Sequence, residues 1–130
     1  MAIHWTVGAD AVDPQRLAAF WALALGYVRE PGFDEPGNAS IIDPDDPSRA
    51  IGFLRVPEPK TSKNRFHLDL RVAHGLGEDA DREALVRAKV EELVAAGATE
   101  VRTERYGAPG DEVLGHVVML DPEGNEFCVA

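Results

Sequence analysis

The feature that most constrains the fold is a series of secondary-structure signals that occurs twice along the 130 residues. Each copy begins with a short run typical of a strand, continues with an amphipathic helical segment, and ends with three more strand-like runs. The expected strands lie at residues 3–9, from 27, at 38–43 and at 49–56 in the first copy, and at 65–72, from 98, at 113–120 and at 126–129 in the second. Two β-α-β-β-β modules predict an α+β fold, because hairpins build antiparallel sheets that carry helices on one face.

Both expected helices have boundary signals. Asp13-Pro14 is an N-cap followed by proline at the first helical position, and Gly26 ends the first helix. The second helix begins after Asp79 or Asp81 and stops at Gly97. The apolar positions expected to face the core are Leu17, Phe20, Trp21, Ala24 and Leu25 in the first helix, and Val86, Val90, Leu93 and Val94 in the second.

The charge balance restricts the class of partner. The net charge is −10, whereas nucleic acid and anionic membranes both attract concentrated positive charge, so neither is expected as a partner. The apolar runs are too short to span a bilayer, and residues 1–5 do not resemble a signal peptide. One cysteine fits a reducing compartment. We expect a cytoplasmic protein that binds a small molecule.

The last ten residues, Asp-Pro-Glu-Gly-Asn-Glu-Phe-Cys-Val-Ala, contain a tight turn between two alternating segments. Pro122 presets φ at the first central position, and Gly124 can adopt positive φ. Two earlier motifs precede this hairpin in order, at residues 13–27 (Asp-Pro-x-Arg-Leu-Ala-Ala-Phe-Trp, then Leu-Gly-Tyr) and 56–70 (Val-Pro-Glu-Pro-Lys, then Asn-Arg-Phe-His-Leu-Asp-Leu). Together these motifs resemble the glyoxalase-like domains of the vicinal-oxygen-chelate superfamily, which includes glyoxalase, bleomycin resistance protein and extradiol dioxygenase.

The resemblance implies a single glyoxalase-like domain over residues 1–130, with module one at about 1–57, a linker at about 57–65 and module two at about 65–130. In such proteins the paired βαβββ modules form a curved, cup-like mixed sheet with helices on the outer face and ligand chemistry on the concave face. Homodimers are common. The linker contains Lys60, Lys63 and Arg65, which form either a solvated connector or a basic lip for an anionic ligand.

The resemblance also implies where a metal would bind. Metal-dependent relatives take ligands from four strands, and those positions fall here on Thr6, Leu54, His67 and Cys128. Only His67 is a usual ligand, and Cys128 would serve as a thiolate. Hard ions such as Mg²⁺ or Mn²⁺ require oxygen ligands, which this set almost entirely lacks. We expect no cofactor and no classical metal site; the alternative is an incomplete divalent-metal site of His67, Glu126 and Cys128.

Alternation along residues 66–72 places His67, Asp69 and Arg71 on the face opposite the apolar residues. Asp69 either orients the His67 imidazole or pairs with Arg71. His116 shares a face with Val118 and Leu120, and the family placement makes that face concave. Trp5 is expected in the core because of its apolar area. The expected ligand-binding residues are His4, Thr6, Leu54, His67, Asp69, His116 and Cys128.

Three functions remain open from the sequence. The leading interpretation is a small-molecule-binding protein without the usual divalent metal. The second is a lyase or isomerase in which His67 or His116 acts as general base, with or without a metal, because imidazole titrates near neutral pH. The third is a resistance-type protein that sequesters a drug or metabolite without converting it, since an apolar cup with few polar groups suits binding alone.

Overall fold

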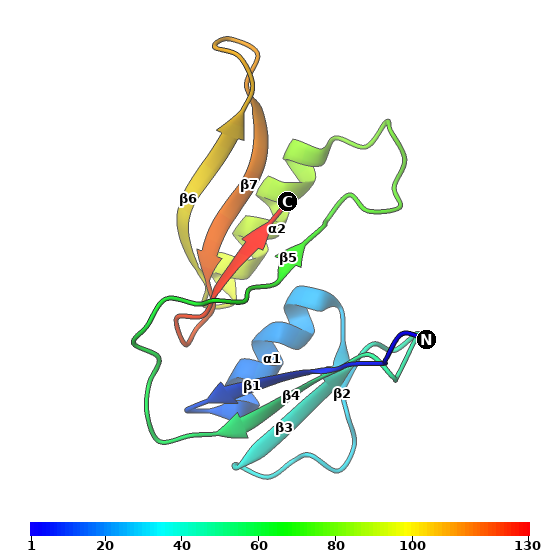
Figure 1. Ribbon diagram of the computed structural model, residues 1–130, viewed down its shortest axis with the longest axis vertical. Helices are drawn as coiled ribbons and strands as arrows, with labels where there is room; N and C mark the ends of the chain where they lie inside the picture. The colour runs from blue at the N-terminus through cyan, green and yellow to red at the C-terminus, as the bar shows by residue number, and fades with distance from the viewer. The chain divides into compact units, whose positions relative to one another are not determined.

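The computed structural model describes residues 1–130, which form two compact units, Met1–Thr61 and Ser62–Ala130. The boundary between them lies inside the predicted linker. The first unit contains β1 (Val7–Ala11), α1 (Pro14–Leu25), β2 (Val28–Arg29), β3 (Asn38–Ile42) and β4 (Ala50–Arg55) (Figure 1). The second contains β5 (Asp69–Leu70), α2 (Arg82–Ala95), β6 (Thr99–Tyr106), β7 (Val113–Leu120) and β8 (Glu126–Val129). The prediction of an α+β fold with two βαβββ modules is confirmed.

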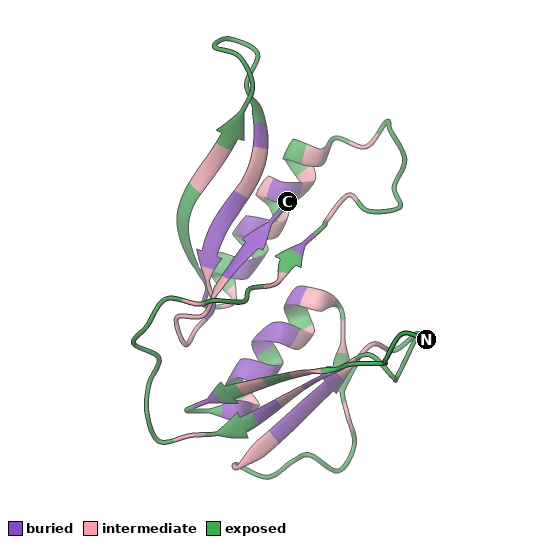
Figure 2. Cartoon of the chain, viewed as in Figure 1, coloured by how far each residue is buried: buried purple, intermediate pink, exposed green.

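The first unit is a mixed sheet of four strands in the order β1-β4-β3-β2, packed against α1. The β1–β4 pair is parallel and the other two pairs are antiparallel. Ile41 and Phe53 are buried on the helix side of the sheet, and Leu17 and Phe20 of α1 are buried with them. Figure 2 shows this buried face between helix and sheet. The core therefore consists of the apolar residues that recur at helical spacing in α1 and at alternate positions in the strands.

The second unit repeats this arrangement with the order β5-β8-β7-β6. Here β5 and β8 are parallel, whereas β7 pairs antiparallel with both β6 and β8. The face of β7 and β8 toward α2 is apolar and fully buried, and α2 contributes Val86, Val90 and Leu93. The residues of β7 and β8 that form this buried face are Val117, Met119, Phe127 and Val129. Neither α1 nor α2 has the length and apolar composition required to cross a membrane.

The predicted helix boundaries are confirmed. The Asp13 carboxylate accepts a hydrogen bond from the Arg16 amide at 3.2 Å, and Asp81, rather than Asp79, accepts one from the Ala84 amide at 3.1 Å. Both helices are followed by a glycine with positive φ, 70° at Gly26 and 112° at position 97. Aspartate thus pairs with free amides at the start of each helix, and glycine adopts the positive φ that follows its end.

The final turn also forms as predicted. The Asp121 carboxylate accepts hydrogen bonds from the amides of Glu123 at 2.9 Å and Asn125 at 3.0 Å. Gly124 has a φ of 84°. Asp121 is buried, so these bonds replace the water that its carboxylate would otherwise bind. The turn fixes the start of β8 and hence the register of every residue that follows.

The first strand of each module is the part that sequence analysis placed wrongly. β1 begins at Val7 and not at residue 3, and β5 has only two residues. Each of these strands extends only as far as its parallel partner offers hydrogen bonds, and β8 is itself only four residues long. His67 therefore lies just before a strand, and Trp5 is 75% exposed and Phe66 93% exposed. The prediction of a core Trp5 was wrong, as was a core position for Val94, which lies at the edge of the α2 stripe and is 45% exposed.

The β6–β7 hairpin contains an irregularity that requires glycine. Gly115 has no partner on β6, and Arg82 of α2 donates hydrogen bonds to the carbonyl oxygens of Gly115 and Leu114. A Cβ atom at position 115 would clash with the ring of Tyr106. That ring is also 5.9 Å from the ring of His116, centroid to centroid. The absent side chain at position 115 is what allows Tyr106 to lie across β7 beside His116.

We predict that replacing either N-cap aspartate lowers the free energy of unfolding. Asp13→Ala and Asp81→Ala each remove an acceptor for an otherwise unpaired helix amide, which costs about 1 kcal/mol. Asp79→Ala is the matched control, because Asp79 is a nearby exposed aspartate outside the cap. Urea unfolding measures all three. Equal stability of Asp79→Ala and Asp81→Ala would contradict the assignment of the cap.

We also predict that Gly115→Ala displaces the Tyr106 ring and lowers stability by about 1–3 kcal/mol, as overpacking commonly does. Tyr106→Ala should relieve most of this loss in the double variant, giving a non-additive cycle. Gly52→Ala is the control, because a Cβ there would meet nothing within 4 Å. Chemical denaturation and the NMR shifts of the His116 ring report the two effects. Additive changes would show that the ring and position 115 do not compete for space.

Candidate functional site

The second sheet has one face against α2 and one opposite face, here called the open face. The open face carries the histidine, cysteine and charged side chains described below. Asp69 pairs with Cys128, Cys128 with Val118, and Val118 with Arg102. Residues paired across neighbouring strands project to the same side of a sheet. Their chain neighbours Val117 and Val129 are fully buried toward the helix, so this row projects the other way.

His67, Asp69 and Cys128 form a compact group on this face. One side-chain donor atom from each lies within 4.8 Å of the other two. Nδ1 of His67 is 3.0 Å from a carboxylate oxygen of Asp69, and both side chains are about two-fifths exposed, at 40% and 42%. The grouping follows from the backbone: residues 67 and 69 share a side of an extended segment, and the Cys128 amide donates to the Leu68 carbonyl between them at 3.0 Å.

Cys128 is a free, buried thiol at the inner edge of this group. Burial raises the pKa of the Cys128 thiol above its ordinary value, and the neighbouring Asp69 carboxylate raises it further. Glu126 adds to this effect, whereas Arg102 opposes it. The isolated thiol therefore stays protonated, and it lacks the electropositive surroundings of a reactive nucleophile.

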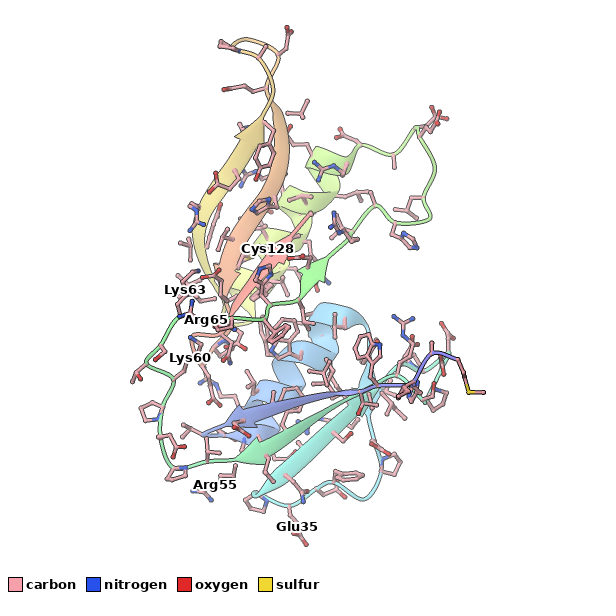
Figure 3. The ribbon with its side chains drawn as sticks, viewed as in Figure 1. Glu35, Arg55, Lys60, Lys63, Arg65 and Cys128 are labelled. Carbon is pink, nitrogen blue, oxygen red and sulfur yellow. The ribbon has the colours of Figure 1, made fainter.

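Glu126 lies on the same face but has a different partner. Its carboxylate accepts hydrogen bonds from Lys63 at 2.6 and 2.8 Å, and its amide donates to Asn64 Oδ1 at 3.0 Å. The Lys63 ammonium holds the pKa of the Glu126 carboxyl below its usual value. Figure 3 shows Lys63 and Arg65 in the segment that runs beside β8 and Cys128. The carboxylate that joins His67 and Cys128 is thus Asp69, while Glu126 ties the linker to β8.

His116 and Arg102 complete the open face. His116 is half-buried on β7, two residues before Val118, and packs near the Tyr106 ring. Two residues along a strand correspond to roughly 7 Å, so His116 lies one row away from Cys128. The Arg102 guanidinium donates to Glu104 at 2.6 Å, which leaves this part of the face with a balanced charge.

The three remaining predicted residues belong to the first unit. His4 is exposed and its Nε2 lies 2.8 Å from the Ser48 carbonyl oxygen. Thr6 is exposed and precedes β1, whereas Leu54 is 60% exposed near the end of β4. Because β1 and β4 are parallel and Leu54 pairs with Asp10, Thr6 and Leu54 lie at opposite ends of that ladder. The structure does not gather these residues within their own module.

The two modules can be compared through their equivalent parallel pairs. Asp10 pairs with Leu54 as Asp69 pairs with Cys128. The position two residues before the aspartate is Gly8 in the first module and His67 in the second. The first module therefore keeps the carboxylate but has glycine and leucine where the second has imidazole and thiol.

This donor chemistry decides whether a hard divalent metal of the kind implied by the family fits. The four positions that the resemblance implies, Thr6, Leu54, His67 and Cys128, supply one imidazole, one thiol, one weak hydroxyl and one alkyl group. The strand pairing makes Gly8 the equivalent of His67 in place of Thr6, which removes the hydroxyl as well. Neither set suits Mg²⁺ or Mn²⁺. The group in the second module could still hold a metal ion of another class. The sequence predicted Asp69 as a ligand-binding residue but named Glu126 in its place as the carboxylate of the alternative metal site, because only the strand register brings Asp69 beside Cys128.

Comparisons with known proteins agree with this architecture. The sequence matches the family described as glyoxalase-like domain over residues 6–130, and no match was found among curated proteins. The structure is similar to a glyoxalase/bleomycin resistance protein/dioxygenase family enzyme from Burkholderia phytofirmans PsJN, with 23% identity, a TM-score of 0.69, and coverage of 98% of this chain and 97% of that chain.

Two further similarities are to the fosfomycin resistance protein FosX from Listeria monocytogenes. The first is 12% identical, with a TM-score of 0.67 and coverage of 99% of this chain and 90% of that chain. The second is a FosX mutant complexed with Mn(II) and 1S,2S-dihydroxypropylphosphonic acid, 11% identical, with a TM-score of 0.65 and coverage of 99% and 92%. These structural similarities concern the fold, and the sequence match spans nearly the whole chain. The chain therefore belongs to the glyoxalase-like domain family of the vicinal-oxygen-chelate superfamily.

Proposed function

We propose that this glyoxalase-like protein binds a small molecule at the open face of its second sheet, without the hard-metal site that the family implies. The observation that carries the proposal is the gathering of His67, Asp69, His116 and Cys128 on the side of the sheet that α2 does not cover. The exposed Tyr106 ring, close to His116, adds apolar surface there, whereas Val118 of the same row is buried. A few polar groups on an apolar surface are the usual composition of a ligand site.

Membership of the family supports a small polar ligand. The similar fosfomycin resistance protein binds Mn(II) together with a phosphonic acid in one of its structures. In the present chain the hard-metal donors are missing, so recognition would depend on imidazole, carboxylate and aromatic groups. Ligand contact by His4, Thr6 and Leu54 of the first module stays a prediction.

The binding proposal predicts that some compounds in a panel of planar drugs and small carboxylates or phosphonates raise the melting temperature of EDTA-treated protein. A ligand at a hundred times its Kd stabilises the folded state by about 2.7 kcal/mol. His67→Ala and His116→Ala should reduce the shift, whereas His74→Ala, an exposed loop histidine of the same module, should not. If no compound stabilises the protein, or if all three variants respond alike, the proposed face is not the binding site.

A second candidate function is acid–base catalysis, and one observation favours it. Asp69 accepts a hydrogen bond from His67 Nδ1 in the tautomer that leaves Nε2 free to take a proton. A carboxylate that orients an imidazole in this way is a common arrangement for a general base. His67 would then abstract a proton next to the carbonyl group of a bound substrate, as a lyase or isomerase requires.

The catalytic candidate predicts proton exchange on a bound carbonyl compound. In D₂O with EDTA, a ligand found by the thermal screen should exchange an acidic C–H, followed by NMR. His67→Ala should slow exchange by about 10²–10⁴-fold, and Asp69→Asn should slow it less because the amide oxygen can still accept the Nδ1 proton. Ligand binding with no exchange in the wild-type protein would identify a sequestering protein of the resistance type.

Two earlier predictions stay attached to this proposal. Homodimer formation is a prediction for light scattering of the purified chain. A cytoplasmic location would suit the single free thiol, since a reducing compartment keeps such a group from forming disulfides.

A further inference from the structure

The group formed by His67, Asp69 and Cys128 combines three different donor types in one small volume. It supplies an imidazole nitrogen, a carboxylate oxygen and a sulfur, all within 4.8 Å of one another. All three residues belong to the second module, on β5, on β8 and on the segment just before β5. His67 and Cys128 stand at two of the four positions that the family implies, whereas Asp69 does not, and no residue of the first module takes part.

The geometry is close to that of a coordination sphere. Zinc takes sulfur at about 2.3 Å and nitrogen or oxygen at about 2.0–2.2 Å, so tetrahedral donors lie roughly 3.3–3.7 Å apart. The His67 nitrogen and the Asp69 oxygen are already 3.0 Å apart, and the sulfur is within 4.8 Å of both. Small side-chain rotations would bring the three donors around one ion.

The donor chemistry selects the class of ion. Thiolate and imidazole prefer borderline ions such as Zn²⁺ or Co²⁺ over Mg²⁺ and Mn²⁺, which favour carboxylate and water. A bound thiolate and one carboxylate carry two negative charges, which a divalent ion neutralises. The nearby Glu126 adds little to this balance because Lys63 is paired with it.

Access and a supporting backbone are both present. The side chains of His67 and Asp69 are about two-fifths exposed, so an ion can reach them, while Cys128 is held by the buried end of β8. The β8 backbone is bonded to this segment on either side of Asp69, from Cys128 to the Leu68 carbonyl and from Ala130 to the Leu70 carbonyl. The two strands that hold the donors therefore cannot slide apart without breaking the sheet.

We infer that His67, Asp69 and Cys128 bind one zinc-class divalent ion within the second module. Three protein ligands leave one tetrahedral position for water or a ligand, which is the pattern of an open zinc site. The ion would occupy His67, so the acid–base candidate above belongs to the metal-free protein. The metal site is independent of the proposed small-molecule binding. The thermal screen for small molecules uses EDTA-treated protein, so either proposal can fail without the other.

The test is metal binding by the full-length chain stripped with EDTA. We expect one Zn²⁺ per chain in competition with a chromophoric indicator, and a sulfur-to-metal charge-transfer band when Co²⁺ is the probe. His67→Ala, Asp69→Asn and Cys128→Ser should each weaken Zn²⁺ binding by at least the ~10–100-fold that loss of an outer partner costs. Cys128→Ser should also abolish the Co²⁺ charge-transfer band.

The matched controls are Glu126→Gln, on the same face, and His74→Ala, an exposed loop histidine of the same module; neither residue is one of the three donors. Both should bind Zn²⁺ as the wild type does. Circular dichroism of each variant shows whether it is folded. If Cys128→Ser does not fold, Asp69→Asn still tests the site, because it keeps the size of the side chain and removes only the charge. Tighter binding of Mn²⁺ than of Zn²⁺, a Co²⁺ complex without the charge-transfer band, or equal Zn²⁺ affinity in donor variants and controls would each overturn the inference.

Discussion

The parallel pairing of the first and fourth strands is the constraint on which each module depends. In the second module it is short: two residue pairs, extended by the bond from Cys128 to the Leu68 carbonyl and by those that link Ala130 with Leu70 and Val72. Parallel strands cannot be joined by a tight turn, so the helix and the strands between them form the crossover connection. The register of that pair also decides which side chains meet. One residue of slip would turn Cys128 toward α2 and move Phe127 out of the core.

The same register explains why the chemistry of the two modules differs although their folds are equivalent. Asp10 and Asp69 occupy corresponding rungs, but Gly8 and Leu54 stand where His67 and Cys128 stand in the second module. Both modules can thus keep the apolar pattern that faces their helix, while only the second module carries an imidazole and a thiol on the opposite face. The backbone requires apolar residues toward the helix, and it places far weaker demands on the opposite face.

The features predicted correctly from sequence are those determined by local interactions. Asp13, Asp81 and Asp121 each satisfy backbone amides within four residues, so their roles are visible in a short window. The ends of β1 and β5 depend on distant partner strands, and these were wrong. Trp5 was placed in the core because of its large apolar area, yet the strand that would have directed it inward does not begin until Val7. Joining Asp69 to Cys128 required the register, which no local pattern contains.

Charge pairing on the open face separates supporting groups from those available for chemistry. Lys63 is bound to Glu126 and Arg102 to Glu104, and each pair is a neutral unit. Asp69, by contrast, faces an imidazole, which is positively charged only when protonated, and a thiol whose pKa is raised by burial. In a chain with a net charge of −10, the ion-pair partner of this carboxylate is His67 and not a lysine or arginine. A proton on His67 or a metal ion between the three donors would supply the missing positive charge, and these two possibilities compete for the same imidazole.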